Sequence, residues 1–400
     1  MNFKTIILAS ATSLLLAGTA MAQTAVKIGV LNDRSGIYAD LSGEGSVIAA
    51  RMAVEDFDAA GKGITVEIVS ADHQNKPDVA STIARQWYDQ DGVDLIVDVP
   101  TSSAAFAVSD ITKEKGKVFM NSGAGSADLT GAKCSPNTIH WTYDTWALAH
   151  GTGNAVVETG GKSWFFITAD YAFGQALETD TSAVVTAAGG EVLGSVKHPF
   201  PGTDFSSFLL QAQSSGAQVI GLANAGGDTV NTIKQASEFG ITQAGQSLAG
   251  LLIFITDIHA LGLETAQGLV LTEAFYWDLN DETRAWSERF AAENGGNKPS
   301  MVHAGVYASV LHYLKAVEAT GGKETEALLA SMKSTPTSDP LFGEGSVRED
   351  GRVIHDMYLF KVKAPADSTG AWDYYETMAT IPAAEAFRPM EEGGCPFVAD

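Results

Sequence analysis

Positively charged residues are scarce in this sequence. Its 400 residues include 25 Lys and Arg against 48 Asp and Glu, which gives a formal net charge of −23. Because such a charge repels phosphate backbones and anionic lipid surfaces, nucleic acid is not an expected partner. The ordinary consequence of this charge is solubility. An anionic ligand would have to be held by local groups against the overall field.

Long apolar runs are absent outside the N-terminus. Residues 1–22 have the parts of a signal peptide: Lys4, an apolar core over 6–17 and the small-residue motif AMA. We expect cleavage after Ala22, and an uncleaved membrane anchor is the alternative. No Cys follows the cleavage site, so a lipoprotein is not expected. No other apolar run reaches about 18 residues, and we therefore expect an exported chain without stable membrane insertion.

Cysteine is rare, because the sequence contains only Cys134 and Cys395. In an oxidising, exported compartment a single pair most often forms a disulfide. Such a bond would tie the C-terminal tail back to the body of the protein. Two free thiols are the alternative.

Motifs for covalent, phosphate or metal chemistry are missing. The sequence has neither a G-x-S-x-G turn nor a G-x-x-x-x-G-K-[ST] loop. Gly123 and Gly125 begin a dinucleotide-like pattern, but Asp128 stands where the third Gly is required. The eight His are scattered, and no H-x-x-x-H pair occurs. We expect no cofactor, no metal and no catalysis; an exported hydrolase on a doubly wound α/β fold is the alternative.

The sequence does contain a repeated alternation of strand and helix. Apolar, β-branched stretches at 26–31, 64–72 and 93–99 predict buried strands, and the segments between them have helical spacing. The alternation restarts after Tyr143. This order predicts parallel sheets covered by helices on both faces. Because 400 residues exceed one ordinary domain, two such lobes are expected.

Clusters of Ser, Thr and Gly follow two of the predicted strands. The stretch VDLIVDVPTSSAAFAVSD places Ser102 and Ser103 between a strand and a helix. Hydroxyls and free N–H groups at the carboxyl edge of a sheet, beside the positive end of a helix, suit a small anionic or polar solute. A helix N-cap without a ligand is the structural alternative. The pattern predicts solute binding.

Several stretches together resemble one known family. They are IGVLNDRSG, the pair VPTSSAAFAVSD and NSGAGSADLT, ITADYAFGQ, and GLANAGGDTVNTIKQASEFGI. With these the chain resembles the periplasmic binding proteins of fold type I, in the branch that includes the Leu/Ile/Val-binding proteins. The resemblance covers nearly all of the chain after the signal peptide. A narrower likeness is to members from α-proteobacteria that capture aromatic acids.

The resemblance implies an α/β fold of two doubly wound parallel-sheet lobes joined by crossover strands, with the ligand in the cleft between them. We accordingly divide the chain after residues 1–22 into lobe 1 (23–142 and 273–350) and lobe 2 with the C-terminal tail (143–272 and 351–400).

The same resemblance implies a role in transport. We expect a monomeric periplasmic protein that captures a small carboxylate, either a branched-chain or aromatic amino acid or an aromatic acid. It would deliver this ligand to ABC transporter permease subunits in the inner membrane. A ligand-sensing module of a receptor is a further alternative, because receptor ectodomains share the fold.

Matches to the family's motifs predict residues that contact the ligand. Ala124, Gly125 and Ser126 align with a loop that offers backbone donors and a hydroxyl, for which an ordinary Gly-rich turn is the alternative. Tyr171 matches a tyrosine that leans over the ligand from lobe 2. Asp228 matches an acidic residue that receives an α-amino group. A core tyrosine and a helix N-cap are the respective alternatives.

Aromatic residues are expected to complete the pocket. Phe275 and Tyr276 are expected to form an apolar wall for the ligand side chain, and an aromatic core plug is the alternative. Tyr38, in the first loop, is expected to close the pocket from lobe 1. Two departures from the family pattern are Leu41, which replaces a tryptophan, and the second loop, which reads Ala-Gly-Ser. These departures leave open a ligand without an amino group, for which Asp228 would only cap a helix.

Overall fold

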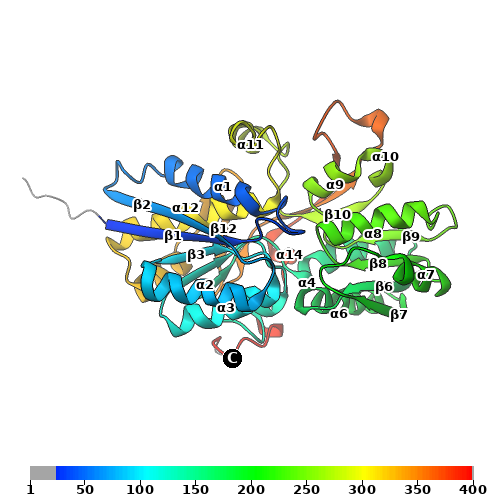
Figure 1. Cartoon of the computed structure of the whole chain (residues 1–400), viewed down its shortest axis with the longest axis horizontal. Coiled ribbons are helices and arrows are strands. Elements are labelled where there is room, and N and C mark those ends of the chain that lie inside the picture. The colour runs from blue at the N-terminus through cyan, green and yellow to red at the C-terminus, as the bar shows by residue number, and fades with distance from the viewer. Residues whose placement is uncertain (1–23, 399–400) are drawn as a thin grey trace, which may run out of the picture.

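The computed structural model describes residues 24–398, which form two α/β lobes (Figure 1). The sheet of lobe 1 has the order β2-β1-β3-β4-β5, and all neighbouring strands are parallel. Its inner strands β3 and β4 are completely buried, as expected for a parallel sheet with helices on both faces. The strands are β1 (Thr24–Asn32), β2 (Ile64–Asp72), β3 (Leu95–Asp98), β4 (Val118–Asn121) and β5 (Thr138–His140).

Helices cover this sheet, and α12 is buried along almost its whole length. It begins at Ser300, whose Oγ accepts hydrogen bonds from the N–H groups of Val302 and His303. α12 packs against α1, which joins a late part of the chain to lobe 1. The helices are α1 (Gly43–Asp56), α2 (Pro77–Gln86), η1 (Trp87–Asp91), α3 (Ser102–Glu114), η2 (Ala127–Thr130), α11 (Asp281–Glu293), α12 (Met301–Thr320) and α13 (Thr325–Ser334). A small antiparallel sheet adds β11 (Thr337–Asp339), β12 (Gly343–Val347) and β13 (Val353–Ile354).

Lobe 2 repeats the design with the parallel order β7-β6-β8-β9. An antiparallel sheet, β10-β14-β15, packs with its core. The strands are β6 (Ser163–Ala169), β7 (Glu191–His198), β8 (Val219–Ala223), β9 (Ser247–Gly250), β10 (Val270–Glu273), β14 (Met357–Val362) and β15 (Tyr375–Ile381). The helices are α4 (Thr145–Leu148), η3 (Ala149–Gly153), α5 (Asn154–Glu158), α6 (Ala172–Ala187), α7 (Ser206–Ser214), α8 (Gly227–Glu238), α9 (Ile255–Leu261) and α10 (Leu263–Ala266).

The chain passes between the lobes after β5, after β10 and after β13, and a fourth time after β15. The last passage carries η5 (Met390–Glu392) and α14 (Ala383–Ala386), after the short η4 (Pro365–Asp367) of lobe 2. A disulfide between Cys134 and Cys395, 261 residues apart, fastens this tail to lobe 1 and confirms the predicted pairing. The predicted division assigns 351–400 to lobe 2 together with the C-terminal tail. β14 and β15 lie there, but the tail returns to lobe 1 because its contacts and its disulfide are made there.

The predicted signal peptide over 1–22 lies outside the described residues. Within residues 24–398, no helix combines the length and the apolar character needed to cross a membrane.

Candidate functional site

The carboxyl ends of the two parallel sheets supply one cavity. In open α/β sheets, ligands bind where the strand order reverses, which here is between β1 and β3 and between β6 and β8. The loops after these four strands contribute Tyr38, Pro100, Tyr171 and Ala225 to the cavity. Both lobes therefore meet at their topological switch points.

The cavity is narrow, with about 10 Å³ accessible to a water-sized sphere, and most of its lining is aromatic or aliphatic. Its walls carry no Lys or Arg side chain. The polar groups that reach it are phenol hydroxyls and backbone atoms. The lining residues are Tyr38, Leu41, Pro100, Gly123, Gly125, Tyr143, Tyr171, Phe173, Ala225, Leu252 and Phe254.

Two phenols span the cavity from opposite lobes. The hydroxyls of Tyr38 and Tyr171 lie 2.6 Å apart and share a hydrogen bond. Phe200 stacks on Tyr171 with ring centroids 4.0 Å apart. Burial, with the Asp228 carboxylate adding a smaller effect, raises the pKa of both tyrosines, so both remain neutral. The structure thus places both predicted tyrosines in the site.

Close packing explains the glycine at position 125. A Cβ on Gly125 would lie 2.8 Å from the ring of Phe173 and 2.9 Å from the ring of Tyr143, both closer than van der Waals contact. The Tyr143 hydroxyl donates a hydrogen bond to the carbonyl of Gly123. No described residue accepts a hydrogen bond from the N–H of Gly125. At Gly123 and Gly125 the cavity wall therefore consists of backbone atoms without side chains.

The other predicted residues of this region support Gly125 without lining the cavity. Ser102 is fully buried, and its Oγ accepts a hydrogen bond of 3.2 Å from the N–H of Ser126. Ser103 is half-buried in the first turn of α3, which begins after the N-cap Thr101. The N–H of Ala124 donates to Asn121 at 3.1 Å. The structure brings these residues together, with Ser126 capping η2 through the N–H of Asp128.

Backbone strain occurs where β3 enters the cavity wall. Asp98 and Val99 have φ angles of 80° and 56°, and a β-branched residue rarely adopts such values. The Asn121 side chain donates to the carbonyls of Asp98 and Val99, at 3.1 and 3.3 Å, and holds this turn. Strain of this kind gathers at ligand sites, and here it precedes the cavity residue Pro100.

Asp228 is a buried carboxylate that does not cap its helix. The N-cap of α8 is Gly226, and no side chain caps this helix end. One oxygen, Oδ1, accepts a 2.9 Å hydrogen bond from the N–H of Gly202, and Oδ2 has no hydrogen-bond partner among residues 24–398. Burial raises the pKa of Asp228 to about 7, against the opposing effect of the Gly202 hydrogen bond. The carboxylate is therefore short of one donor.

His198 does not supply that donor as a cation. Its Nδ1 lies 3.9 Å from Oδ2 of Asp228 but is already in hydrogen-bond contact with the carbonyl of Pro199, at 2.8 Å. Burial lowers the pKa of His198, so the imidazole is neutral at pH 7.

Phe275 and Tyr276 lie away from the cavity and in the core. Phe275 is fully buried and packs edge-on against Trp286. Tyr276 packs against Tyr375 with centroids 4.9 Å apart, and its hydroxyl donates to the carbonyl of Trp372. Both residues come shortly after β10, and their rings are packed in the hydrophobic core. The structure therefore favours the alternative of an aromatic core plug.

Other residues that line the cavity were not predicted from the sequence. In the sequence, Leu41 stands out only as a departure from the family pattern. Phe173 stands two residues after Tyr171 in the same loop and could have been included with it. Leu252 and Phe254 follow β9 in an apolar run that reads as ordinary core. The other unpredicted residues are Pro100, Gly123, Tyr143 and Ala225.

Known proteins resemble this chain in both architecture and sequence. The sequence model of the periplasmic binding protein family matches residues 25–371. The chain belongs to the periplasmic binding protein family. A periplasmic binding protein from Burkholderia mallei is 52% identical, with a TM-score of 0.91 over 94% of this chain and 99% of that chain.

Two further relatives connect this periplasmic binding protein to the Leu/Ile/Val-binding branch. A branched-chain amino acid ABC transporter periplasmic ligand-binding protein from Burkholderia xenovorans is 40% identical, with a TM-score of 0.82 over 93% of this chain and 99% of that chain. Leu/Ile/Val-binding protein homolog 6 of Brucella melitensis is 29% identical over 366 residues, or 88% of this chain and 92% of that protein. The predicted family and fold are confirmed, and the protein is a periplasmic binding protein of the ABC transporter type.

Proposed function

We propose that this protein captures an α-amino acid with an apolar or aromatic side chain and delivers it to the permease of an ABC importer without changing it. The observation that carries the proposal is Asp228, which lies just outside the cavity lining. Its buried Oδ2 has no partner among residues 24–398, and its carboxylate contributes to the raised pKa of the cavity residues Tyr38 and Tyr171. An ammonium group would supply the missing donors. A charge-assisted hydrogen bond of this kind contributes about 1.5–3 kcal/mol.

The ligand carboxylate would lie at the opposite side of the site, in lobe 1. The first-turn N–H groups of α3 have no partner within the helix and carry its positive dipole end. Gly125 lines the cavity, and its N–H, which has no acceptor among the described residues, would be a further donor. These neutral donors suit a carboxylate in a cavity without Lys or Arg.

The apolar walls would hold the ligand side chain. Leu41, Phe173, Leu252 and Phe254 offer it aliphatic and aromatic surface. Burial of such a side chain contributes about 1.5–3 kcal/mol. The cavity therefore favours leucine-like or phenylalanine-like side chains over polar ones.

Cleft closure would present both lobes to inner-membrane permease subunits, and the protein would act in the periplasm as a monomer. The family membership and the location of the cavity between the lobes support this role.

A thermal-shift screen tests the ligand class. The exported protein would be heated with L-leucine, L-phenylalanine, benzoate, 4-hydroxybenzoate, glucose or putrescine, and hits would be titrated by calorimetry. A ligand at 100 times its Kd adds about 2.7 kcal/mol of stability, which raises the melting temperature. We expect stabilisation by an amino acid, with the ligand recovered unchanged. Stabilisation by benzoates alone would shift the assignment to aromatic acids, stabilisation only by glucose or putrescine would overturn the carboxylate class, and turnover would overturn capture.

A further inference from the structure

The C-terminal segment reaches the loop that forms one wall of the cavity. We call residues 383–398 the C-terminal strap; it leaves lobe 2 after β15 and is fastened to Cys134 in lobe 1. Between these points, Nη2 of Arg388 donates a 3.0 Å hydrogen bond to the carbonyl of Ala127. A Cβ on Gly131 would lie 2.8 Å from the carbonyl oxygen of Gly393, so the strap and the loop are in close contact.

The strap is itself held firmly near Arg388. Nη1 of Arg348 donates a 2.7 Å hydrogen bond to the carbonyl of Arg388, and Nε and Nη2 of Arg348 donate to the Asp350 carboxylate. The guanidinium of Arg352 lies 4.3 Å from the ring centroid of Phe387. The Arg388 side chain therefore extends from an anchored backbone.

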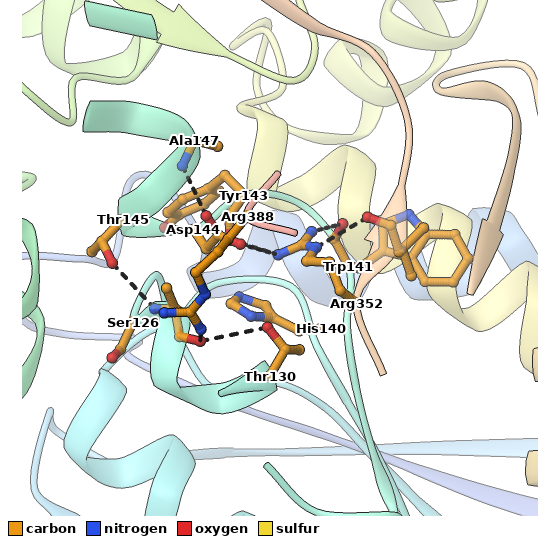
Figure 2. Close-up of polar contacts among 12 residues, drawn as sticks. Ser126, Thr130, His140, Trp141, Tyr143, Asp144, Thr145, Ala147, Arg352 and Arg388 are labelled. Carbon is orange, nitrogen blue, oxygen red and sulfur yellow. Dashed lines mark hydrogen bonds and ion pairs between the residues drawn. The ribbon is translucent and has the colours of Figure 1, made fainter. Parts of the chain in front are cut away.

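A short chain of hydrogen bonds continues from Ala127 to the cavity. The N–H of Ala127 donates to Oγ1 of Thr145 at 3.1 Å, and the N–H of Thr145 donates to the carbonyl of Gly125 at 2.8 Å. Gly125 lines the cavity. Figure 2 shows Ser126, Thr145 and Arg388 in this region.

We propose that the C-terminal strap positions the ligand-binding loop over residues 123–127, with Arg388 as the positioning residue and the Cys134–Cys395 disulfide as the anchor of the strap. Arg388 acts through Ala127 and is not itself part of the cavity lining. The proposal rests on the proposed function in one respect, which is that this loop contacts the ligand. Loss of the strap contact would leave the loop free to move and would weaken ligand binding.

Hydrogen–deuterium exchange of the ligand-free protein tests the strap without any ligand. The amides of Ser126, Ala127 and Thr145 report on the loop, because all three are hydrogen-bonded. We expect Arg388→Gln, and the double variant Cys134→Ser with Cys395→Ser, to exchange at least about tenfold faster at these amides. Arg388→Lys should restore slow exchange, since an ammonium can still donate to the Ala127 carbonyl.

Arg284→Gln is the matched control, because it removes an Arg paired with Asp278 and Asp281 on the surface of α11. Calorimetry with L-leucine and L-phenylalanine, well below the melting temperature, supplies the second measurement. We expect Kd to rise about tenfold in Arg388→Gln and to recover in Arg388→Lys.

The outcomes separate this proposal from the proposed function. Unchanged exchange at the loop in Arg388→Gln overturns the strap, and faster exchange with an unchanged Kd overturns its role in positioning. If neither amino acid binds the wild-type protein, the ligand class fails, and the exchange results alone decide the strap. If the double cysteine variant does not fold, the comparison of Arg388→Gln with Arg388→Lys decides it.

Discussion

A single buried carboxylate carries most of the chemical specificity proposed for this protein. Asp228 has one oxygen satisfied by Gly202 and one without a partner, in surroundings that raise its pKa to about 7. Burying a charge without a full set of donors is unfavourable, so the free protein holds this carboxyl poised between its two protonation states at neutral pH. A ligand ammonium would favour the ionised form.

Amino-acid affinity should therefore fall in acid. Below pH 7, binding to the ionised Asp228 must first displace its proton, which weakens affinity by about tenfold for each pH unit. Above pH 7 the carboxylate is already ionised and the affinity should level off. Calorimetric titration with L-leucine between pH 8 and 5.5 measures this profile.

Asp228→Asn removes the titrating group. It should weaken binding by about 10- to 100-fold at pH 8 and flatten the profile, whereas Glu191→Gln, at an exposed position of β7, should leave both unchanged. A wild-type affinity that is constant from pH 8 to 5.5 would contradict the ammonium-binding role.

The segments that connect the lobes are tied together by one buried cation. Arg352, immediately before β13, is completely buried and donates hydrogen bonds to the carbonyls of Trp141, Tyr143 and Val353 (Figure 2). It also lies 3.4 Å from the carboxylate of Asp144, whose other oxygen caps α4. Arg352 thus ties the first passage between the lobes, which contains Trp141 and Tyr143, to the segment that leads into the third passage. Tyr143 also lines the cavity.

Arg352→Met should destabilise the protein strongly. The substitution keeps an unbranched side chain but removes the charged partner of the buried Asp144 carboxylate and a donor from each of three carbonyls, which costs about 3–5 kcal/mol. Urea unfolding followed by circular dichroism measures the change. Arg284→Met, at a surface ion pair, should change stability by less than about 1 kcal/mol. A loss below 1 kcal/mol in Arg352→Met would show that the passages are held by other contacts.

The two lobes contact each other directly across the cleft. The hydrogen bond between Tyr38 and Tyr171 joins them, and so does the 3.1 Å hydrogen bond from the N–H of Gly227 to the carbonyl of Ile37. Both contacts use loops that follow switch-point strands. These two contacts between the lobes therefore lie at or next to the candidate ligand cavity.

Tyr38→Phe should shift the ligand-free protein toward an open arrangement. Removal of one hydroxyl leaves that of Tyr171 without its partner, and a hydrogen bond of this kind contributes about 0.5–1.5 kcal/mol, or about 2- to 12-fold in the ratio of open to closed molecules. Small-angle X-ray scattering should then give a larger radius of gyration. Tyr358→Phe, on β14 in lobe 2, is the control. A radius equal to that of the wild type would mean that the phenol pair does not hold the lobes together.

The sequence by itself determined the fold and the anchor of the tail. The spacing of apolar residues predicts the alternating strands and helices, and polar clusters at strand ends mark the edge where Ser102 and Gly125 lie. Two cysteines in an exported chain leave one intramolecular pairing, which the structure shows between Cys134 and Cys395. These features depend on local periodicity and composition, which can be read along the chain.

Only the tertiary structure decided which aromatic residues face the ligand cavity. Phe275, Tyr276, Tyr143 and Phe254 all belong to buried hydrophobic clusters, yet only Tyr143 and Phe254 also line the cavity. The return of the tail to the loop around Ala127 is equally invisible in the sequence. The physical reason is that core and cavity side chains satisfy the same hydrophobic pattern, while the choice between them depends on neighbours far away in the chain.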